Sequence, residues 1–170
     1  RDGDEGAFET LLERYRRPLF SFILRMVGHR GDAEDIFQET FIRVLQHRGD
    51  FDSRRSFGPW LFTIAANLVR DERRKKWRRP ENQMPESMDF PGPSNPEADA
   101  ADEETGSEVE RAVTALPPEQ REVFLLREQA GLSFKEIAEA TGANLNTALG
   151  RMRLAVKKLR ADLAHLETKE

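Results

Sequence analysis

The stretch FGPWLFTIAANLVRDERRKKWRR, residues 57–79, decides how the rest of the chain is organised. Apolar residues in its first half recur at helical spacing and predict one buried stripe: Phe57, Trp60, Leu61, Ile64, Ala65 and Leu68. The second half, Arg70–Arg79, holds seven basic residues and Trp77 against two acids. Seven cations exceed what a helix C-terminus requires. They indicate either a solvated helix end or a surface for a polyanion, of which nucleic acid is the usual one.

Composition limits the possible classes of protein. The chain has 170 residues, 38% hydrophobic and 34% charged, which suits one medium domain or two small helix-rich ones. It contains no cysteine, which excludes disulfides and thiolate metal sites. No apolar run approaches the roughly 18 residues of a membrane span, so we expect no membrane insertion. The opening residues RDGDEGAF lack the pattern of a signal peptide, and a cytoplasmic location is expected.

The net charge of −4 conceals three unlike segments. Residues 1–80 hold 17 basic and 13 acidic side chains, residues 81–108 hold none and nine, and residues 109–170 hold ten and nine. This distribution predicts a basic module, an acidic middle and a nearly neutral second module. Residues 81–107 are rich in proline and acids and predict a flexible linker. One hypothesis is that this acidic segment competes with DNA for the basic surfaces.

Two amphipathic helices are predicted before the central stretch. The first covers residues 8–26, with a bend near Pro18, and the second follows a cap at Asp32. The expected inner face of the second helix is Ile36, Phe37, Phe41, Val44 and Leu45. Asp35, Gln38, Glu39 and Arg43 fall on the other faces and are expected to remain free for a partner. With the central helix, capped by Ser56, these helices predict a compact bundle.

The second module, residues 108–170, has the pattern of a helix-turn-helix. A helix is expected from Glu108, and Pro117-Pro118 separates it from another over residues 118–129, with Val123, Phe124 and Leu126 in the core. Ser133 and Glu136 form a capping box before a short helix, and Gly142 supplies the turn. Asn144 or Asn146 caps the last helix. Its expected buried face is Leu145, Ala148, Met152, Ala155 and Leu159, and its exposed face is Arg151, Arg153, Lys157, Lys158 and Arg160.

Three stretches together resemble a bacterial sigma factor of the extracytoplasmic-function (group IV) type in the sigma-70 family. They are DAEDIFQETFIRVLQ, FGPWLFTIAANLVRDERRKK and ALPPEQREVFLLREQAGLSFKEIAEATGANLNTALGRMRLAVKKLR. The resemblance implies an all-α fold in which residues 1–80 form a sigma-2 domain and residues 108–170 a sigma-4 domain, joined by the flexible acidic linker. It implies an alternative sigma factor that binds core RNA polymerase, directs it to promoter DNA and promotes opening. It also implies an anti-sigma factor as a partner.

The resemblance also assigns site residues. Those at the core polymerase interface would be Asp35, Gln38 and Glu39, with Phe41 supporting their helix. Those at the −10 element would be Asn67, Asp71, Arg74 and Lys75, with the loop 51–56 as a pocket for an extruded base. Those at the −35 element would be Asn146, Thr147, Leu149, Gly150, Arg151, Arg153 and Lys157. Whether the arginines contact bases or phosphates stays open. We expect Trp60 in the core rather than at the site of DNA melting.

The last helix departs from the pattern of many relatives, which begin it with Gly-Thr-Val-Lys-Ser. Here the residues are Asn146 to Gly150, and Leu149 takes the place of the usual lysine. Gly150 also costs about 1 kcal/mol of helix propensity. The departure leaves the way in which this helix meets the −35 element open.

Two other classes of protein compete with the sigma factor. An ordinary helix-turn-helix regulator that binds an operator would account for the second module but not for the acidic and basic surfaces of the first. An enzyme is not expected, because His29, His47 and His165 are isolated and no phosphate loop or nucleophile–base pair is present. A metal at the acids of residues 32–39 would lack further ligands, so neither a metal nor a cofactor is expected.

Overall fold

The computed structural model describes residues 5–52, 54–79 and 100–166, which form seven α-helices without a strand. The helices are α1 (Glu5–Val27), α2 (Arg30–His47), α3 (Phe57–Trp77), α4 (Ala100–Thr114), α5 (Pro118–Glu128), α6 (Phe134–Thr141) and α7 (Leu145–Leu163). The expected all-α fold is confirmed. None of the helices in the described ranges is long and apolar enough to cross a membrane.

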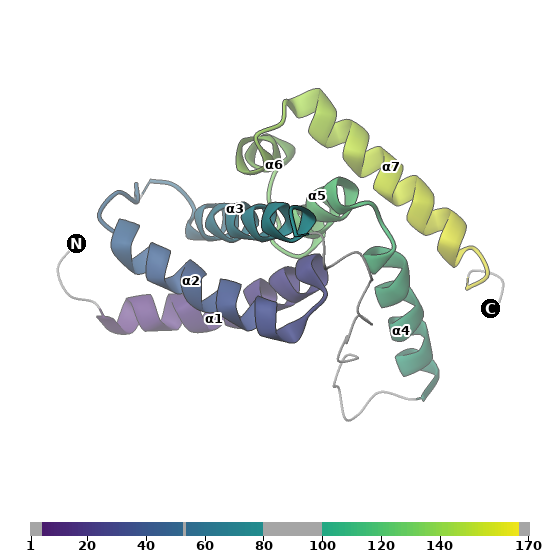
Figure 1. Ribbon diagram of the computed structural model, residues 1–170, viewed down its shortest axis with the longest axis horizontal. Helices are drawn as coiled ribbons and strands as arrows, with labels where there is room; N and C mark the ends of the chain where they lie inside the picture. The colour runs from purple at the N-terminus through teal and green to yellow at the C-terminus, as the bar shows by residue number, and fades with distance from the viewer. Residues whose placement is uncertain (1–4, 53, 80–99, 167–170) are drawn as a thin grey trace.

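The helices α1, α2 and α3 pack on one another as the predicted bundle (Figure 1). Its centre holds fully buried aromatic and aliphatic side chains, with the rings of Phe22 and Phe62 edge to face at 5.6 Å. Gly58 lets α3 approach α1, because a Cβ atom there would lie 2.9 Å from the Tyr15 hydroxyl oxygen. Pro18 lies inside α1, which continues to Val27 and ends before Gly28, where φ is +76°.

Two details of α2 differ from the prediction. The helix begins at Arg30, and its cap is His29, whose Nδ1 accepts a hydrogen bond from the Asp32 amide at 3.4 Å. The Asp32 carboxylate instead accepts a hydrogen bond from Lys76 at the end of α3. Leu45 was expected inside but is 50% exposed. The buried stripe is narrow, with one residue per turn at Ala33, Ile36, Thr40 and Val44, and Leu45 lies about 100° round the helix from Val44.

The C-terminal helices follow most of the local signals. The capping box of Ser133 and Glu136 is present, Gly142 ends α6 at a φ of +68°, and the Asn144 side chain accepts from the Thr147 amide at 2.8 Å. Val123 and Leu126 are buried, whereas Phe124 is half-buried and Leu125 takes the expected place inside.

Two boundaries of the second half are corrected. The helix expected from Glu108 begins at Ala100, so the last part of the predicted linker is helical. Residues 80–99 lie outside the described residues. Leu145 was expected on the buried face of α7 but is 48% exposed, because it is the first residue of the helix and no neighbouring element covers it.

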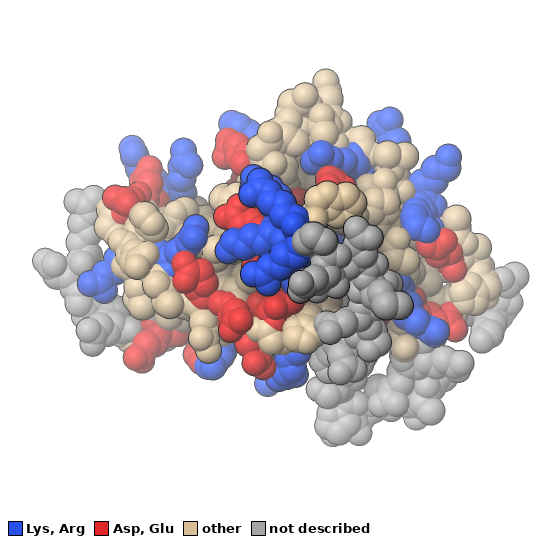
Figure 2. Space-filling view, viewed as in Figure 1, with Lys and Arg blue, Asp and Glu red and all other residues tan. Residues whose placement is uncertain are grey.

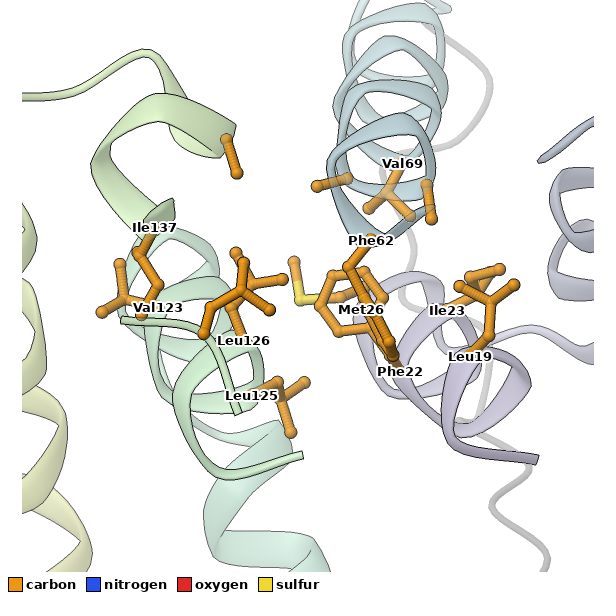
Figure 3. Close-up of a cluster of buried hydrophobic side chains, with 14 of the residues drawn as sticks. Leu19, Phe22, Ile23, Met26, Phe62, Val69, Val123, Leu125, Leu126 and Ile137 are labelled. Atoms are coloured by element: carbon orange, nitrogen blue, oxygen red, sulfur yellow. The ribbon is translucent and has the colours of Figure 1, made fainter. Parts of the chain in front are cut away.

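The two predicted modules pack against each other. Figure 3 shows Leu125 and Leu126 of α5 directed toward Phe22 and Met26 of α1, with the side chains from both halves forming one cluster. α3 also contacts α6, and α7 lies beyond α5 and α6 (Figure 1). The core therefore extends from the bundle into the helix-turn-helix.

A buried arginine closes this contact. Arg121 of α5 donates hydrogen bonds to three carbonyl oxygens: Thr114 at 2.6 Å, Leu116 at 3.0 Å and Arg25 of α1 at 3.0 Å. Its guanidinium therefore holds the turn between α4 and α5 and joins both to the C-terminal end of α1.

We expect Arg121→Met to lower the free energy of unfolding by about 2–4 kcal/mol, because three buried carbonyl oxygens lose a charged donor. Urea denaturation followed by circular dichroism measures the change. The matched control is Arg160→Met on the exposed side of α7, which should alter stability by less than about 0.5 kcal/mol. Equal effects of the two substitutions would contradict the role given to Arg121.

Candidate polymerase and nucleic-acid interfaces

The outer side of α2 combines acids with apolar surface. Asp35 and Gln38 are exposed. Glu39 was expected to remain free for a partner, but it forms an ion pair at 3.0 Å with Arg43, one turn further along the helix. Phe41 is half-buried and its ring lies 4.7 Å from that of Phe37. These two rings, with Leu12 of α1, line an open hollow of about 400 Å³.

Two exposed apolar residues of this surface were not predicted from the sequence. Ile42 and the misassigned Leu45 are 47% and 50% exposed on α2. Their apolar chemistry gave no signal of exposure, because any apolar residue near a helical stripe is assigned to the core. Together with Asp35 and Gln38 they give α2 a surface on which a protein partner would find both apolar and charged contacts.

The C-terminal half of α3 carries the basic residues. Lys and Arg side chains gather over α3 at the centre of the face in Figure 2. Arg74 and Lys75 are exposed, and Arg74 donates to Asp71 at 2.9 Å. The Trp77 side chain is 92% exposed, so it stands clear of the core beside these cations. This end of α3 therefore offers positive charge and an aromatic face together.

Aromatic rings pack together at the loop before α3. The ring of Trp60 lies 4.9 Å from Phe51 and 5.7 Å from Phe57, and all three are half-buried. Trp60 thus packs at the margin of the bundle. Arg54 donates to the Asp52 carboxylate at 3.0 Å, and residue 53 lies outside the described residues. The rings form an apolar wall beside the part of the loop that is described.

The −10 candidates adjoin the second module. Arg70 donates to the Asn67 side chain and to the Ala140 carbonyl oxygen of α6, the latter at 2.6 Å. It also lies 3.6 Å from the buried Glu122 carboxylate of α5. Arg73 donates to Glu119 at 3.4 Å. Asn67, which was predicted from the sequence, is therefore held by an arginine that bridges to the helix-turn-helix.

The −35 candidates divide between two sides of α7. Asn146, Leu149, Arg153 and Lys157 are exposed and, with the half-exposed Gly150, follow one stripe opposite the buried Ala148, Ala155 and Leu159. Arg151 lies elsewhere. It lines a hollow between the modules with Arg70, Arg73 and Trp77. Thr147 donates its amide to the helix cap. The stripe is the part of α7 available to a groove of DNA.

Within the described ranges, no group of three or more His, Asp or Glu side chains is placed to hold a metal ion.

Comparison with known proteins gives the relatives of the chain. The family model for sigma-70 region 2 matches residues 11–79, and that for sigma-70 region 4 matches residues 107–159. RNA polymerase sigma factor CarQ of Myxococcus xanthus is 35% identical over 98% of this chain and 95% of its own length. ECF RNA polymerase sigma factor SigE of Mycolicibacterium smegmatis is 33% identical over 95% of this chain, which spans 65% of that longer protein.

A solved structure has the same fold. It is the sigma factor RpoE of Bartonella quintana in complex with the anti-sigma factor NepR, and it matches 96% of this chain and 99% of that one with a TM-score of 0.79 and 22% identity.

The pKa values of Glu122 and Glu119 are shifted in opposite directions, although both residues lie on α5. Burial raises the pKa of Glu122, against the opposing attraction of Arg70, Arg73 and Arg151. The pKa of Glu119 is lowered, chiefly by a hydrogen bond from its own backbone amide, with Arg73 and Arg151 contributing. A group whose pKa is raised by folding stabilises the folded state at pH values below its unfolded-state pKa. This stabilisation is lost as the pH rises through its folded-state pKa. A group whose pKa is lowered by folding stabilises the folded state at pH values above its unfolded-state pKa. This stabilisation is lost as the pH falls through its folded-state pKa.

We therefore expect two isosteric variants to diverge with pH. Relative to the parent, the unfolding free energy of Glu122→Gln should rise between about pH 4 and pH 8, because the variant no longer ionises a buried group. That of Glu119→Gln should fall as the pH rises to about pH 5, because the parent gains stability when Glu119 ionises below its unfolded-state pKa. Urea denaturation at several pH values measures both differences. Differences of the same sign would show that one of the two environments is misassigned.

Proposed function

The chain belongs to the extracytoplasmic-function sigma factors of the sigma-70 family, and we propose that three of its exposed surfaces divide the work of starting transcription. As an alternative sigma factor it binds core RNA polymerase, directs it to promoter DNA and promotes strand opening. The observation that carries the division is their placement: an acidic and apolar side of α2, a basic end of α3 and a basic stripe on α7. Residues 1–80 act as the sigma-2 domain and residues 108–170 as the sigma-4 domain.

The polymerase surface is the outer side of α2. Asp35 and Gln38 are exposed there, Glu39 adds a second carboxylate, and the Phe41 ring packs on Phe37, which in turn packs against Phe20 of α1. The exposed Ile42 and Leu45 supply apolar contact area. A mixed surface of this kind suits a stable protein interface, in which apolar contacts supply affinity and charges set the orientation.

The −10 surface is the C-terminal half of α3. Asn67, Asp71, Arg74 and Lys75 contact the DNA there, and Trp77 adds a ring on which an unpaired base can stack. The hydrogen bond from Arg70 to Asn67 must be exchanged when Asn67 meets DNA. The wall formed by Phe51, Phe57 and Trp60 lies at the other end of α3, where an extruded base would need an apolar face.

The −35 surface is the exposed stripe of α7, where Asn146, Arg153 and Lys157 are the polar contacts. Thr147 and Arg151 belong to its flank, and Arg151 contributes when the hollow between the modules opens. An operator-binding regulator would also use this helix, but it would leave the side of α2 and the end of α3 without a role.

A further partner is an anti-sigma factor, as in the complex of RpoE with NepR. Because core polymerase and promoter DNA are its partners, the protein acts in the cytoplasm. It contributes no catalysis of its own: the reaction belongs to the polymerase, and the described residues supply contacts with protein and DNA.

Reversing the charge on α2 tests the polymerase surface. Asp35→Lys with Glu39→Lys should weaken binding to core polymerase about tenfold or more, because like charges then meet across the interface. The fold should persist, since the lost Glu39–Arg43 pair is exposed and contributes only about 0.3–0.5 kcal/mol. Binding is measured by fluorescence anisotropy with labelled sigma factor.

The matched control carries Glu128→Lys and Glu139→Lys, which make the same change of charge on exposed residues of α5 and α6, away from the proposed contact. It should bind core polymerase nearly as tightly as the parent. Equal affinities of the two double variants would remove α2 from the interface.

Separate substitutions test the two DNA surfaces. Arg153→Ala should reduce holoenzyme binding to duplex DNA that carries the upstream element, by about 1–3 kcal/mol if a base contact is lost. Asn67→Ala and Arg74→Ala should spare that binding and impair opening, and a pre-melted template should restore part of the activity. Permanganate reactivity of the start region, with and without core polymerase, reports opening.

The control is Arg111→Ala, a change at an exposed arginine of α4 that should affect neither step. Opening that is unaffected by Asn67→Ala and Arg74→Ala would remove α3 from the −10 contact. A footprint made by the purified chain without polymerase would favour the operator-binding regulator.

A further inference from the structure

The exposed stripe of α7 has an apolar residue at its middle. Leu149 is 39% exposed, and it lies one helical turn from both Asn146 and Arg153, which are exposed on the same stripe. The buried contacts of α7 are made by Ala148, Ala155 and Leu159 on the opposite side. Leu149 therefore contributes little to the core, and its neighbours one turn away are Leu145 and Asn146 before it and Met152 and Arg153 after it.

Gly150 follows Leu149 and has no structural need to be glycine. A Cβ atom at this position would meet nothing within 4 Å, and only Gly28, Gly131 and Gly142 have a positive φ among the described residues. Glycine inside a helix is costly relative to alanine, because its backbone loses more conformational freedom. Neither the packing nor the backbone of this chain repays that cost. A side chain of minimal size here instead leaves room for another molecule to come close to the helix.

The chemistry of DNA bases selects what Leu149 can meet. In the major groove, most base edges present hydrogen-bond donors and acceptors, and the only methyl group belongs to thymine. Leucine forms no hydrogen bond, so placing it against a polar edge would remove water from that edge without replacing the lost bond. Against a thymine methyl group it buries apolar surface from both partners.

We propose that Leu149 reads the C5-methyl group of a thymine in the −35 element, and that Gly150 lets α7 come close enough for that contact. The inference rests on the proposed function, since it requires α7 to enter the major groove. The exposed Leu145 also lies one turn before Leu149, but DNA is favoured over a protein as the occupant because the same stripe carries Asn146, Arg153 and Lys157, which suit base edges and phosphates. The leucine at this position thus sets the base preference.

Replacing thymine by deoxyuridine tests the contact, because only the methyl group is removed. The probe is holoenzyme binding to a promoter duplex in which each thymine of the −35 element is replaced in turn. At one position we expect binding to fall about three- to fivefold, which corresponds to one buried methyl group. Leu149→Ala should bind the unmodified duplex more weakly by a similar factor and lose the response to deoxyuridine.

The matched control is Leu154→Ala. Leu154 is 53% exposed on the same helix but outside the stripe, so this variant should keep the full response to deoxyuridine. If Leu149→Ala leaves both promoter binding and the deoxyuridine response unchanged, Leu149 does not face DNA and the inference is overturned, with a protein partner as the remaining occupant. If no single deoxyuridine weakens the parent, the inference is overturned as well.

Gly150→Ala gives an independent test with two readouts. The variant should melt a few degrees higher than the parent because alanine favours the helix. It should bind the promoter at least several-fold more weakly, because the added methyl group keeps α7 from the groove. Higher stability with unchanged binding would overturn the close approach.

Arg153→Ala separates this inference from the proposed function. If Arg153→Ala weakens binding to the −35 element while every deoxyuridine duplex binds normally, only the thymine contact is wrong. If neither change matters, α7 does not bind the −35 element and the proposed function fails at that surface.

Discussion

Two adjacent charged residues of α5 fix how the halves of the molecule sit together. Arg121 binds carbonyl oxygens of α1 and of the α4–α5 turn, and the Glu122 carboxylate faces Arg70 of α3. Charges buried in this way are tolerated only where their partners are held in place, so the contact admits few alternative arrangements. Apolar packing of Leu125 and Leu126 on Phe22 and Met26 supplies the buried surface of this contact. The two charged residues fix the position of one half relative to the other. The basic end of α3 is consequently held beside the helix-turn-helix.

Local signals in the sequence predicted most of the helices. The capping box at Ser133, the turn at Gly142 and the Asn144 cap depend on residues within three positions of one another, so they can be read without tertiary structure. The errors have tertiary causes. Leu45 and Leu145 have the right chemistry for a core, but no neighbouring element covers them. Asp32 has the right chemistry for a cap but binds Lys76, which lies 44 residues further along the chain.

The candidate sites divide in the same way. Exposed positions such as Asp35, Arg74 and Arg153 could be predicted from helical periodicity, since they lie opposite apolar stripes. The contact of Arg70 with Ala140 and the burial of Glu122 could not, because their partners are about 50 to 70 residues distant and a charged residue is expected at the surface. Arg151 shows the limit of periodicity: it shares a helix with Arg153 but faces the other module.

The ion pairs between the modules bear on how ionic strength acts on this protein. Salt screens partly exposed pairs such as Arg73–Glu119, which weakens the contact that holds the basic end of α3 against α5. The same salt opposes promoter binding, since cations released from the phosphates gain less entropy at higher concentration. On the proposed assignment of Arg151 to the −35 surface, the two effects have opposite signs, because loosening the modules exposes arginine side chains that DNA binding then uses. The measured dependence of promoter affinity on salt concentration would therefore be shallower than the number of phosphate contacts implies.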